Sequence, residues 1–437
     1  MKPNIVFTIA DDQRGSALGC ADVEPVRTPC LDALAARGVR CARAYHHGAS
    51  CGAVCAPSRA MLHTGLPHAQ LDPDMVGPTY PAGGRRANVP PTLCGKLQHA
   101  GYHCFATGKW HNGVDAFHAS FNDGDNIFFG GMADHWFTPV HAFDSTGRYP
   151  ADDASPADGF STDVFGQTAV DFIHSRKDDD QPFVCYCAFT APHDPRTPVD
   201  AWRRQYNPTK LPLPENFMPA HPFDNGELAI RDERLLGHPR DPAEIRRGVA
   251  EYYAMISHMD AWIGRIHQAV ADIGQLDNTI IIHTADHGLA VGQHGLLGKQ
   301  NMYEHSVRVP LLLAGPRLPH GAVREGLCYQ HDLHPTLLEL ADAPAAGVFF
   351  ESLLPMLNDA TRGRSHVTSH YYNVQRMACD DRYKLIEYRV DGRLREQLFD
   401  LAADPWEMHD LIDNPAHAAR LGALRSRLPD IAPQSAA

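Results

Sequence analysis

The sequence predicts an α/β fold, in which a mainly parallel sheet is sandwiched by helices and a small antiparallel sheet with one helix follows. Short, continuously apolar runs alternate with helix-like segments over the first 347 residues. This pattern is typical of strands that helices cover on both faces. After about Gly347 the pattern changes to short runs in which polar and apolar residues alternate. Such alternation is typical of an antiparallel sheet with one solvated face.

The strands of the main sheet are expected at five short, apolar and largely β-branched runs. They are residues 4–10, 102–107, 182–190, 279–284 and 309–314. The expected helices are residues 30–37, 58–63, 92–100, 163–174, 243–273 and 331–341. Gly38 and Gly101 directly follow two of these helices, as glycine commonly does at a helix C-terminus.

Two long segments have weak periodicity. Residues 115–161 are rich in Gly, Asp, His and aromatic residues, and we interpret them as a long functional loop. Residues 195–242 are proline-rich and are expected to be irregular. Near the C-terminus, two short strands at 382–388 and 394–401 precede a closing helix at 415–428. The sequence therefore predicts a catalytic domain at 1–347 and a smaller α+β subdomain at 348–437.

Composition excludes several kinds of partner. The 437 residues include 39 basic and 52 acidic side chains, which gives a net charge of −13. This balance argues against a nucleic acid or an anionic membrane as partner, although a local cationic pocket can still bind an anionic substrate. The apolar runs are too short to cross a bilayer. No signal peptide fits before the first strand, so we expect a cytoplasmic protein whose 11 cysteines are mainly reduced.

Four polar clusters each follow a predicted strand directly. They are Asp11-Asp12, Lys109 with His111, His193, and Asp286-His287. Because ligands bind beyond the carboxyl ends of parallel strands, all four clusters are expected at one edge of the sheet. The three carboxylates and one imidazole make a plausible site for a single divalent cation.

Other candidate residues lie in loops or at a helix start. Cys55 is at the entrance of a predicted helix, which is a natural anion site, and Arg59 follows one turn later. Lys299 ends a glycine-containing loop at 295–299. Each residue also has an ordinary alternative: a buried structural cysteine, or a solvated arginine or lysine.

Three segments carry a resemblance to a known family. Residues 55–65, CAPSRAMLHTG, resemble the signature of the type I sulfatases of the alkaline phosphatase superfamily: Cys-x-Pro-Ser-Arg, three residues, then Leu-Thr-Gly. Residues 108–111, GKWH, look like the second motif of that family. Near the C-terminus, LFDL at 398–401, Asp404-Pro405 and Glu407 look like its final strand and turn.

The resemblance implies a fold, a modification and a set of roles. It implies an alkaline-phosphatase-like fold and the conversion of Cys55 to formylglycine by a formylglycine-generating enzyme. The hydrated aldehyde would then supply the nucleophile. The implied ligands of one divalent cation, calcium by preference, are Asp11, Asp12, modified Cys55, Asp286 and His287. The implied catalytic residues are Cys55, Arg59, Lys109, His111, His193 and Lys299.

These roles follow the order of a sulfate transfer. Arg59 and Lys109 would steady modified residue 55, and Lys299 would hold the sulfate oxygens. His193, with Lys299, would assist departure of the alcohol, and His111 would then remove a proton from residue 55 so that sulfate is expelled.

Two residues depart from the family pattern. His63 stands where the signature usually has Leu, outside the Cys, Pro and Arg that conversion needs. His287 stands where many members have Asn, and a nitrogen ligand leaves manganese open as the cation.

The substrate is expected to be a sulfate monoester of a carbohydrate, small or oligomeric. The loop at 130–136 is polar and aromatic, and we expect His135 and Trp136 to contact the substrate, with Trp136 stacked on a sugar ring. The alternatives are an aryl sulfatase, a phosphonate or phosphate ester hydrolase on the same fold, a binding protein without activity, and a metal-binding protein with an unmodified cysteine.

Overall fold

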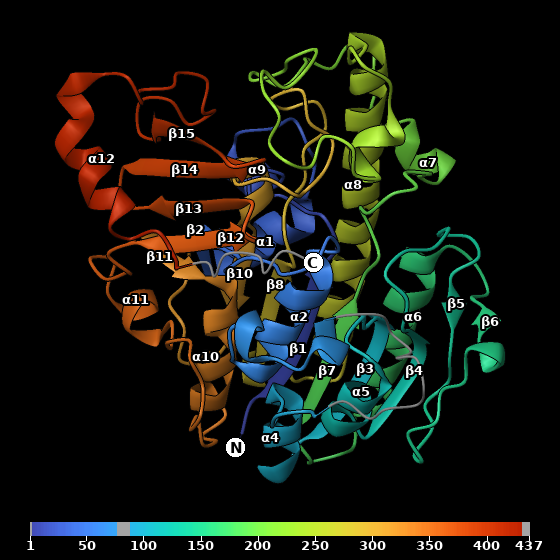
Figure 1. Cartoon of the computed structure of the whole chain (residues 1–437). Coiled ribbons are helices and arrows are strands. Elements are labelled where there is room, and N and C mark those ends of the chain that lie inside the picture. Colours follow the sequence, from blue (N-terminus) through green and yellow to red (C-terminus); the bar gives the residue numbers. More distant parts are fainter. Residues whose placement is uncertain (1, 77–87, 431–437) are drawn as a thin grey trace.

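The computed structural model of the chain describes residues 2–76 and 88–430, and it contains one large sheet and a smaller C-terminal one (Figure 1). The main sheet has the order β11-β2-β10-β8-β1-β7-β3-β4, with β9 paired to β2. Its strands are β1 (Asn4–Ala10), β2 (Val39–Tyr45), β3 (His103–Lys109), β4 (Asp123–Phe128), β7 (Phe183–Ala188), β8 (Thr279–Ala285), β9 (Arg308–Val309), β10 (Leu311–Ala314) and β11 (Ala322–Tyr329).

The centre of this sheet is parallel, as predicted. β1 pairs in parallel with both β7 and β8, and Ile5 is opposite Val184 on one side and Ile280 on the other. β10 runs antiparallel to β8 and β2. Every residue of β1 and β8 is buried, which explains why both strands are mainly apolar and do not alternate between apolar and polar residues.

Helices cover both faces of the main sheet (Figure 1). One face packs against α1 (Pro29–Arg37), α6 (Ser161–Ser175) and α8 (Pro242–Asp272). The other packs against α2 (Cys55–Thr64), α4 (Leu93–His99), α5 (Val114–Ser120) and α10 (Leu333–Leu340). The long helix α8 begins at Pro242, and the side chain of Asp241 caps it by accepting the N–H groups of Ala243 and Glu244. Among the described helices, none combines the length and apolar character that crossing a membrane requires.

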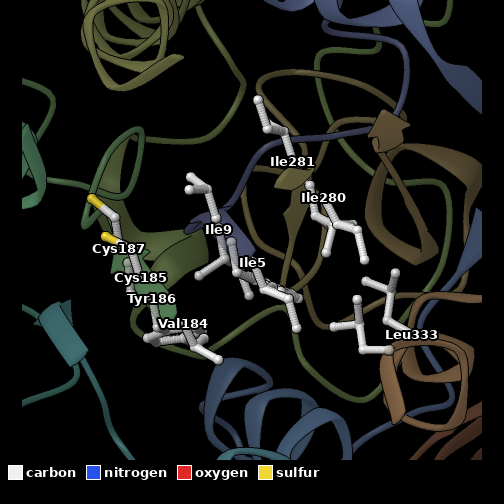
Figure 2. Packing of buried hydrophobic residues seen from close by; sticks show 14 of the residues in the cluster. Ile5, Ile9, Val184, Cys185, Tyr186, Cys187, Ile280, Ile281 and Leu333 are labelled. Atoms are coloured by element: carbon white, nitrogen blue, oxygen red, sulfur yellow. The ribbon is translucent and has the colours of Figure 1, made fainter. Parts of the chain in front are cut away.

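The core between these layers is apolar and combines aliphatic with aromatic side chains (Figure 2). Ile5, Ile9 and Ile280 are fully buried in it. Cys185 and Cys187 project from β7 as core residues, and the Sγ atom of Cys187 lies 3.6 Å from the carbonyl oxygen of Phe165 in α6. All eleven cysteines are within the described residues, and each is a free thiol.

The C-terminal sheet is antiparallel throughout and has the order β12-β13-β14-β15. Its elements are β12 (Val367–Tyr371), β13 (Gln375–Cys379), β14 (Tyr383–Val390) and β15 (Arg393–Asp400), with α12 (Ala418–Arg425) on one face. Met377 and Phe399 belong to the same buried cluster as Tyr45 and Tyr303, so this sheet packs on the main unit. The domain boundary at 347 stays a prediction, and residues 1, 77–87 and 431–437 of the predicted domains lie outside the described residues.

The prediction that residues 115–161 form one long loop is wrong at its start. Helix α5 and strand β4 occupy the first part, and α6 begins at its last residue. β4 contains Asp, Gly and Asn, which disfavour strands, but it pairs with β3 at the edge of the main sheet, and its Ile127 also pairs with His141. Burial of Ile127 and Phe128 outweighs this local preference.

Besides β4, the sequence interpretation lacked β2, β11, β12 and β13, and it lacked the short paired strands β5 (Pro139–Val140) and β6 (Ser155–Pro156). In β2, Arg40 and Arg43 interrupt the apolar pattern, so no continuous run marks it. Arg43 donates to the carbonyl oxygens of Asp380 and Asp381, far along the chain. Such long-range partners cannot be inferred from local periodicity.

Candidate active site

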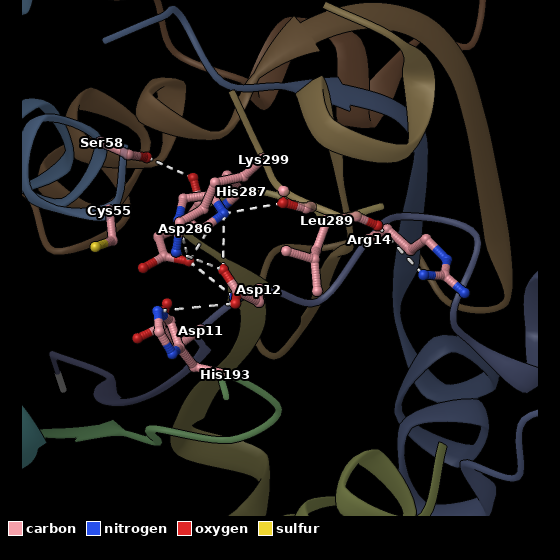
Figure 3. Close-up of polar contacts among 12 residues, drawn as sticks. Asp11, Asp12, Arg14, Cys55, Ser58, His193, Asp286, His287, Leu289 and Lys299 are labelled. Atoms are coloured by element: carbon pink, nitrogen blue, oxygen red, sulfur yellow. Dashed lines mark hydrogen bonds and ion pairs between the residues drawn. The ribbon is translucent and has the colours of Figure 1, made fainter. Parts of the chain in front are cut away.

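The four polar clusters meet at one edge of the main sheet, as the strand order predicts. Figure 3 shows three of them, at Asp11-Asp12, His193 and Asp286-His287. β8, β1, β7 and β3 are neighbours in the sheet, and their carboxyl ends carry Asp286-His287, Asp11-Asp12, His193 and Lys109 respectively. Asp12 and His111 both have positive φ angles, 76° and 61°. Backbone in this region turns sharply, which directs each side chain out of the strand line and into the site.

Three side chains from these clusters and the thiol of Cys55 form a candidate cation site. Asp11, Cys55, Asp286 and His287 each offer one ligand atom, and these atoms all lie within 4.8 Å of one another. The Oδ1 atom of Asp11, the Oδ2 atom of Asp12 and the Nε2 atom of His287 are buried without a hydrogen-bond partner among the described residues. Unpaired buried acceptors are costly, so these donor atoms fit a bound cation. The oxygen-rich set suits calcium, and the imidazole also suits a softer ion such as manganese.

Three basic side chains neutralise the three carboxylates of the site. The Nζ atom of Lys109 pairs with Asp11, that of Lys299 is 2.9 Å from Oδ1 of Asp12, and Nε of Arg59 is 2.9 Å from Oδ2 of Asp286. Burial alone would raise the pKa of Asp11, but the charges of Lys109 and its neighbours hold that pKa well below its usual value.

The pKa values of two other candidate ligands, Asp286 and His287, are raised. Burial and the charge of Asp11 raise the pKa of Asp286. Burial opposes protonation of His287, but the carboxylate of Asp286 outweighs it and raises the pKa of His287 to about 9. A cation bound here would compete with that proton for the imidazole.

Cys55 is the first residue of α2 and is almost fully buried. Its Sγ atom lies 3.2 Å from Nδ1 of His111 and 3.6 Å from Nζ of Lys109. Burial favours the neutral thiol, yet the charges of Lys109, His111 and Lys299 lower the pKa of Cys55 well below its usual value. The site is therefore built to stabilise negative charge on residue 55.

Helix α2 is fixed to the sheet edge by polar contacts. The hydroxyl of Ser58 donates to the carbonyl oxygen of Asp286 at 2.6 Å, and Gln330 donates to the same oxygen at 2.9 Å. Arg59 also donates through a terminal nitrogen to the carbonyl oxygen of Lys109 at 3.1 Å. These bonds hold residue 55 over the strand ends.

His193 approaches from the loop after β7. Its Nδ1 atom lies 2.7 Å from the carbonyl oxygen of Asp194, which places the Nδ1 proton in that hydrogen bond. Its Nε2 atom is 3.9 Å from Oδ2 of Asp12 and therefore faces the site.

Comparisons with known proteins agree with this geometry. The family model described as Sulfatase matches residues 3–343, which is more than half of the chain. A model described as the C-terminal part of N-sulphoglucosamine sulphohydrolase matches residues 292–434. The chain belongs to the sulfatase family. It is a sulfuric ester hydrolase with a sulfatase-like fold, as its sequence predicts.

Relatives of this sulfatase span its whole length. An arylsulfatase of Clostridium perfringens is 28% identical over 98% of this chain and 94% of its own. An N-acetylglucosamine-6-O-sulfatase of Bacteroides thetaiotaomicron is 26% identical over 96% of this chain and 84% of its own.

Solved structures confirm the fold. A protein in complex with its substrate D-glucosamine-2-N,6-O-disulfate superposes with a TM-score of 0.79 at 23% identity, covering 98% of this chain and 97% of the other. A phosphonate monoester hydrolase of Agrobacterium radiobacter superposes with a TM-score of 0.75 at 21% identity, covering 98% and 96%.

The two predicted substrate contacts of the sulfatase differ in their surroundings. His135 is buried, and its ring nitrogens lie 2.8 Å from Oγ of Ser161 and 3.0 Å from the carbonyl oxygen of His193. These contacts favour a role in holding the His193 loop over direct contact with substrate. Trp136 is 46% exposed and packs edge-on against Phe160, so stacking on a sugar stays a prediction.

Several residues near the site were absent from the sequence interpretation. The carbonyl oxygen of Gly131 accepts a hydrogen bond from Nζ of Lys109 at 2.5 Å, and Asn112 donates to the carbonyl oxygen of Ala56 at 2.7 Å. Asp194 pairs with Arg231. Asp194 directly follows His193 in the sequence, and this adjacency was the only local indication of its role.

Proposed function

We propose that this sulfatase hydrolyses a sulfate monoester of a carbohydrate, with Cys55 converted to formylglycine and one divalent cation in the site. Calcium is our first candidate for the cation, with manganese as the alternative. The observation that carries the proposal is the convergence of Cys55, Lys109, His111 and Lys299 on the cluster of buried carboxylates.

The cation would be held by Asp11, Asp12, Asp286, His287 and residue 55. When bound, it would lower the pKa of an oxygen carried by modified residue 55 and so favour its attack on sulfur. The maturation partner is a formylglycine-generating enzyme, for which the motif at 55–59 is the expected target.

The cationic side chains would hold the anionic parts of the reaction. Lys109 lies 3.6 Å from Sγ of Cys55 and is fully buried, so its charge acts on residue 55 with little solvent screening. Lys299 lies in the loop at 295–299, and its Nζ atom donates to Oδ1 of Asp12. It is therefore placed to bind the sulfate oxygens. Arg59 donates to the carboxylate of Asp286 and to the backbone carbonyl of Lys109, and so helps to hold Lys109 in place.

The two histidines would move protons at different atoms. Because Nδ1 of His193 is committed to a backbone carbonyl, Nε2 is the atom that carries a proton toward the leaving alcohol. His111 faces residue 55 through Nδ1 at 3.2 Å and is placed to remove a proton from it when sulfate is expelled.

The substrate class is supported by the relatives and by the exposed side chain of Trp136. One relative is named for a 6-O-sulfated N-acetylglucosamine, and one fold neighbour was solved with a disulfated glucosamine. The half-exposed Trp136 offers an aromatic face near the His193 loop, which suits a sugar ring.

The test is a desulfation screen with enzyme in which mass spectrometry has confirmed the modification of residue 55. Sulfate release would be measured from N-acetylglucosamine 6-sulfate, glucosamine N-sulfate and 4-nitrophenyl sulfate, and alcohol release from phenylphosphonate monoesters, with Cys55→Ala as the blank. We expect a sugar sulfate to have the highest kcat/KM. A higher kcat/KM for the aryl sulfate would assign an arylsulfatase, and a higher value for the phosphonate would reject sulfate specificity.

A further inference from the structure

The proline-rich segment at 195–242 contains a charged turn that contacts both loops of the leaving-group side of the site. Arg231, Asp232 and Glu233, here called the 231–233 turn, lie at the start of the short helix η4 (Asp232–Leu235). Asp232 and Glu233 are buried. A surface loop rarely buries consecutive carboxylates unless each has partners, so their contacts indicate what the turn does.

The first arm of this turn reaches the His193 loop. The guanidinium of Arg231 contacts both carboxylate oxygens of Asp194, one of them at 3.0 Å, and contacts Oδ1 of Asp232 at 3.0 Å. The carboxylate of Asp194 lies 3.4 Å from Nδ1 of His193, on the same side as the carbonyl that accepts the Nδ1 hydrogen bond. Asp194 therefore holds the ring of His193 from behind, and Arg231 holds Asp194.

The second arm reaches the loop that carries Lys299. Glu233 accepts the backbone N–H groups of Leu297 and Gly298 at 2.8 to 3.0 Å, and the carboxylate also binds Arg240 at 2.5 Å. Asp232 accepts from Nε2 of Gln300 at 2.9 Å. These bonds fix the backbone on both sides of Lys299.

The packing at this second arm is too close for a larger residue. A Cβ atom on Gly298 would lie 2.5 Å from Oε1 of Gln300 and 3.1 Å from both Asp232 and Glu233. Side chains of the 231–233 turn are thus in direct contact with the backbone of the loop that carries Lys299. A displacement of the turn would move Lys299 as well.

We propose that the 231–233 turn is a positioning element that holds His193 and Lys299 in register, so that proton donation to the leaving alcohol depends on Arg231. The inference rests on the proposed function, because it assumes that His193 assists departure of the alcohol. Arg231 is half-exposed at 41%, but both terminal nitrogens already bind carboxylates, which favours a positioning role over direct binding of substrate.

The test compares two aryl sulfates that have similar shape and different leaving groups. 4-Nitrophenolate departs without a proton, whereas 4-methoxyphenolate is a poorer leaving group that benefits from one. The variants are Arg231→Met, which removes the charge, and Arg231→Lys, which keeps it without the forked geometry. The matched control is Arg382→Met, because Arg382 also binds both oxygens of one aspartate, Asp400, and its side chain is 53% exposed in the C-terminal sheet.

The expected result is a selective loss of kcat. For Arg231→Met, kcat on 4-methoxyphenyl sulfate should fall roughly 10- to 100-fold, which is the scale of a misplaced catalytic group, while kcat on 4-nitrophenyl sulfate stays nearly unchanged. KM should change little for either ester. Arg231→Lys should recover part of the loss, and Arg382→Met should behave like the wild type.

Three results would overturn the inference: equal losses on both esters, a rise in KM alone, or identical behaviour of Arg231→Met and the control. A rise in KM alone would make Arg231 a substrate-binding residue. Melting temperatures of all variants would show whether an equal loss comes from unfolding. If Arg231→Met is unfolded, the two esters are compared with the Arg231→Lys variant instead. A wild-type enzyme that releases sulfate neither from these esters nor from the sugar sulfates of the desulfation screen would refute the proposed function, and the inference with it.

Discussion

Replacement of Asp286 by asparagine should remove the stabilisation that calcium gives to this sulfatase. Asp286 is buried at the end of β8 and lies in the cluster with Asp11, Cys55 and His287. A cation that binds only the folded protein stabilises it by about 2.7 kcal/mol when its concentration is 100 times its Kd. Unfolding entropy for 437 residues is about 0.9 kcal/mol per kelvin. Calcium should therefore raise the Tm of the wild type by about 3 °C.

The Asp286→Asn variant should differ in two ways. It leaves the guanidinium of Arg59 buried without its partner, and breaking a buried pair costs about 3–5 kcal/mol, or roughly 3–5 °C in Tm. It also lacks a charged cation ligand, so calcium should no longer shift its Tm. Hydrolysis of every sulfate ester should be lost at the same time.

The assay is thermal unfolding of chelated protein with and without added calcium or manganese. Asp332→Asn is the matched control, because Asp332 is also a buried carboxylate paired with an arginine, Arg364, at 2.6 Å. The control should lose stability but keep the full calcium shift. Equal Tm values for the wild type with chelator and with either metal, or a full shift in Asp286→Asn, would refute the cation site.

Three further predictions use other groups. Enzyme made with a formylglycine-generating enzyme should show residue 55 as formylglycine in peptide mass spectra, and Cys55→Ala should lose activity on the order of 10⁶-fold; an active preparation with only plain cysteine would reject the mechanism. His193→Ala should lose about 10²–10⁴-fold in activity on a sugar sulfate and much less on 4-nitrophenyl sulfate. His111→Ala should accumulate a sulfated residue 55, which intact mass spectrometry would detect. Equal losses of activity on both esters without a trapped sulfated species would reject these roles. Burial raises the pKa of Glu407 from 4.5 to about 7, against the opposing charge of Lys384. Because the folded state then binds more protons than the unfolded state between these two pH values, stability should fall as the pH rises through this window. If Glu407→Gln leaves the dependence of Tm on pH unchanged, this prediction is wrong.

Much of the fold could be predicted because the central strands are buried on both faces. β1 and β8 each contain a run of large apolar residues, and that pattern is visible without any tertiary information. β4 and β2 could not be predicted, because their residues favour strands only where a neighbour already pairs with them. In β4, Ile127 and Phe128 are buried and pair with β3. No periodicity within the segment indicates that it forms a strand.

The candidate site divides in a similar way. The sequence by itself indicated the position of Cys55 at a helix start and the groups at the strand ends, because each belongs to a short motif or follows a strand directly. His135 was predicted to contact the substrate, and its two ring contacts were not foreseeable, since they join Ser161 and the backbone of His193. A motif names a residue type and not the partners of its polar atoms.

Only the tertiary structure decided how the charges are paired. Lys299 binds Asp12 across 287 residues, and Arg231 binds Asp194 across 37 residues, within a segment that has no periodicity at all. Local sequence carries information about propensity and burial, which act over one or two turns of chain. Pairing of buried charges depends on which loops the sheet order brings together, and it is fixed only when the chain is folded, because an unpaired charge is too costly to bury.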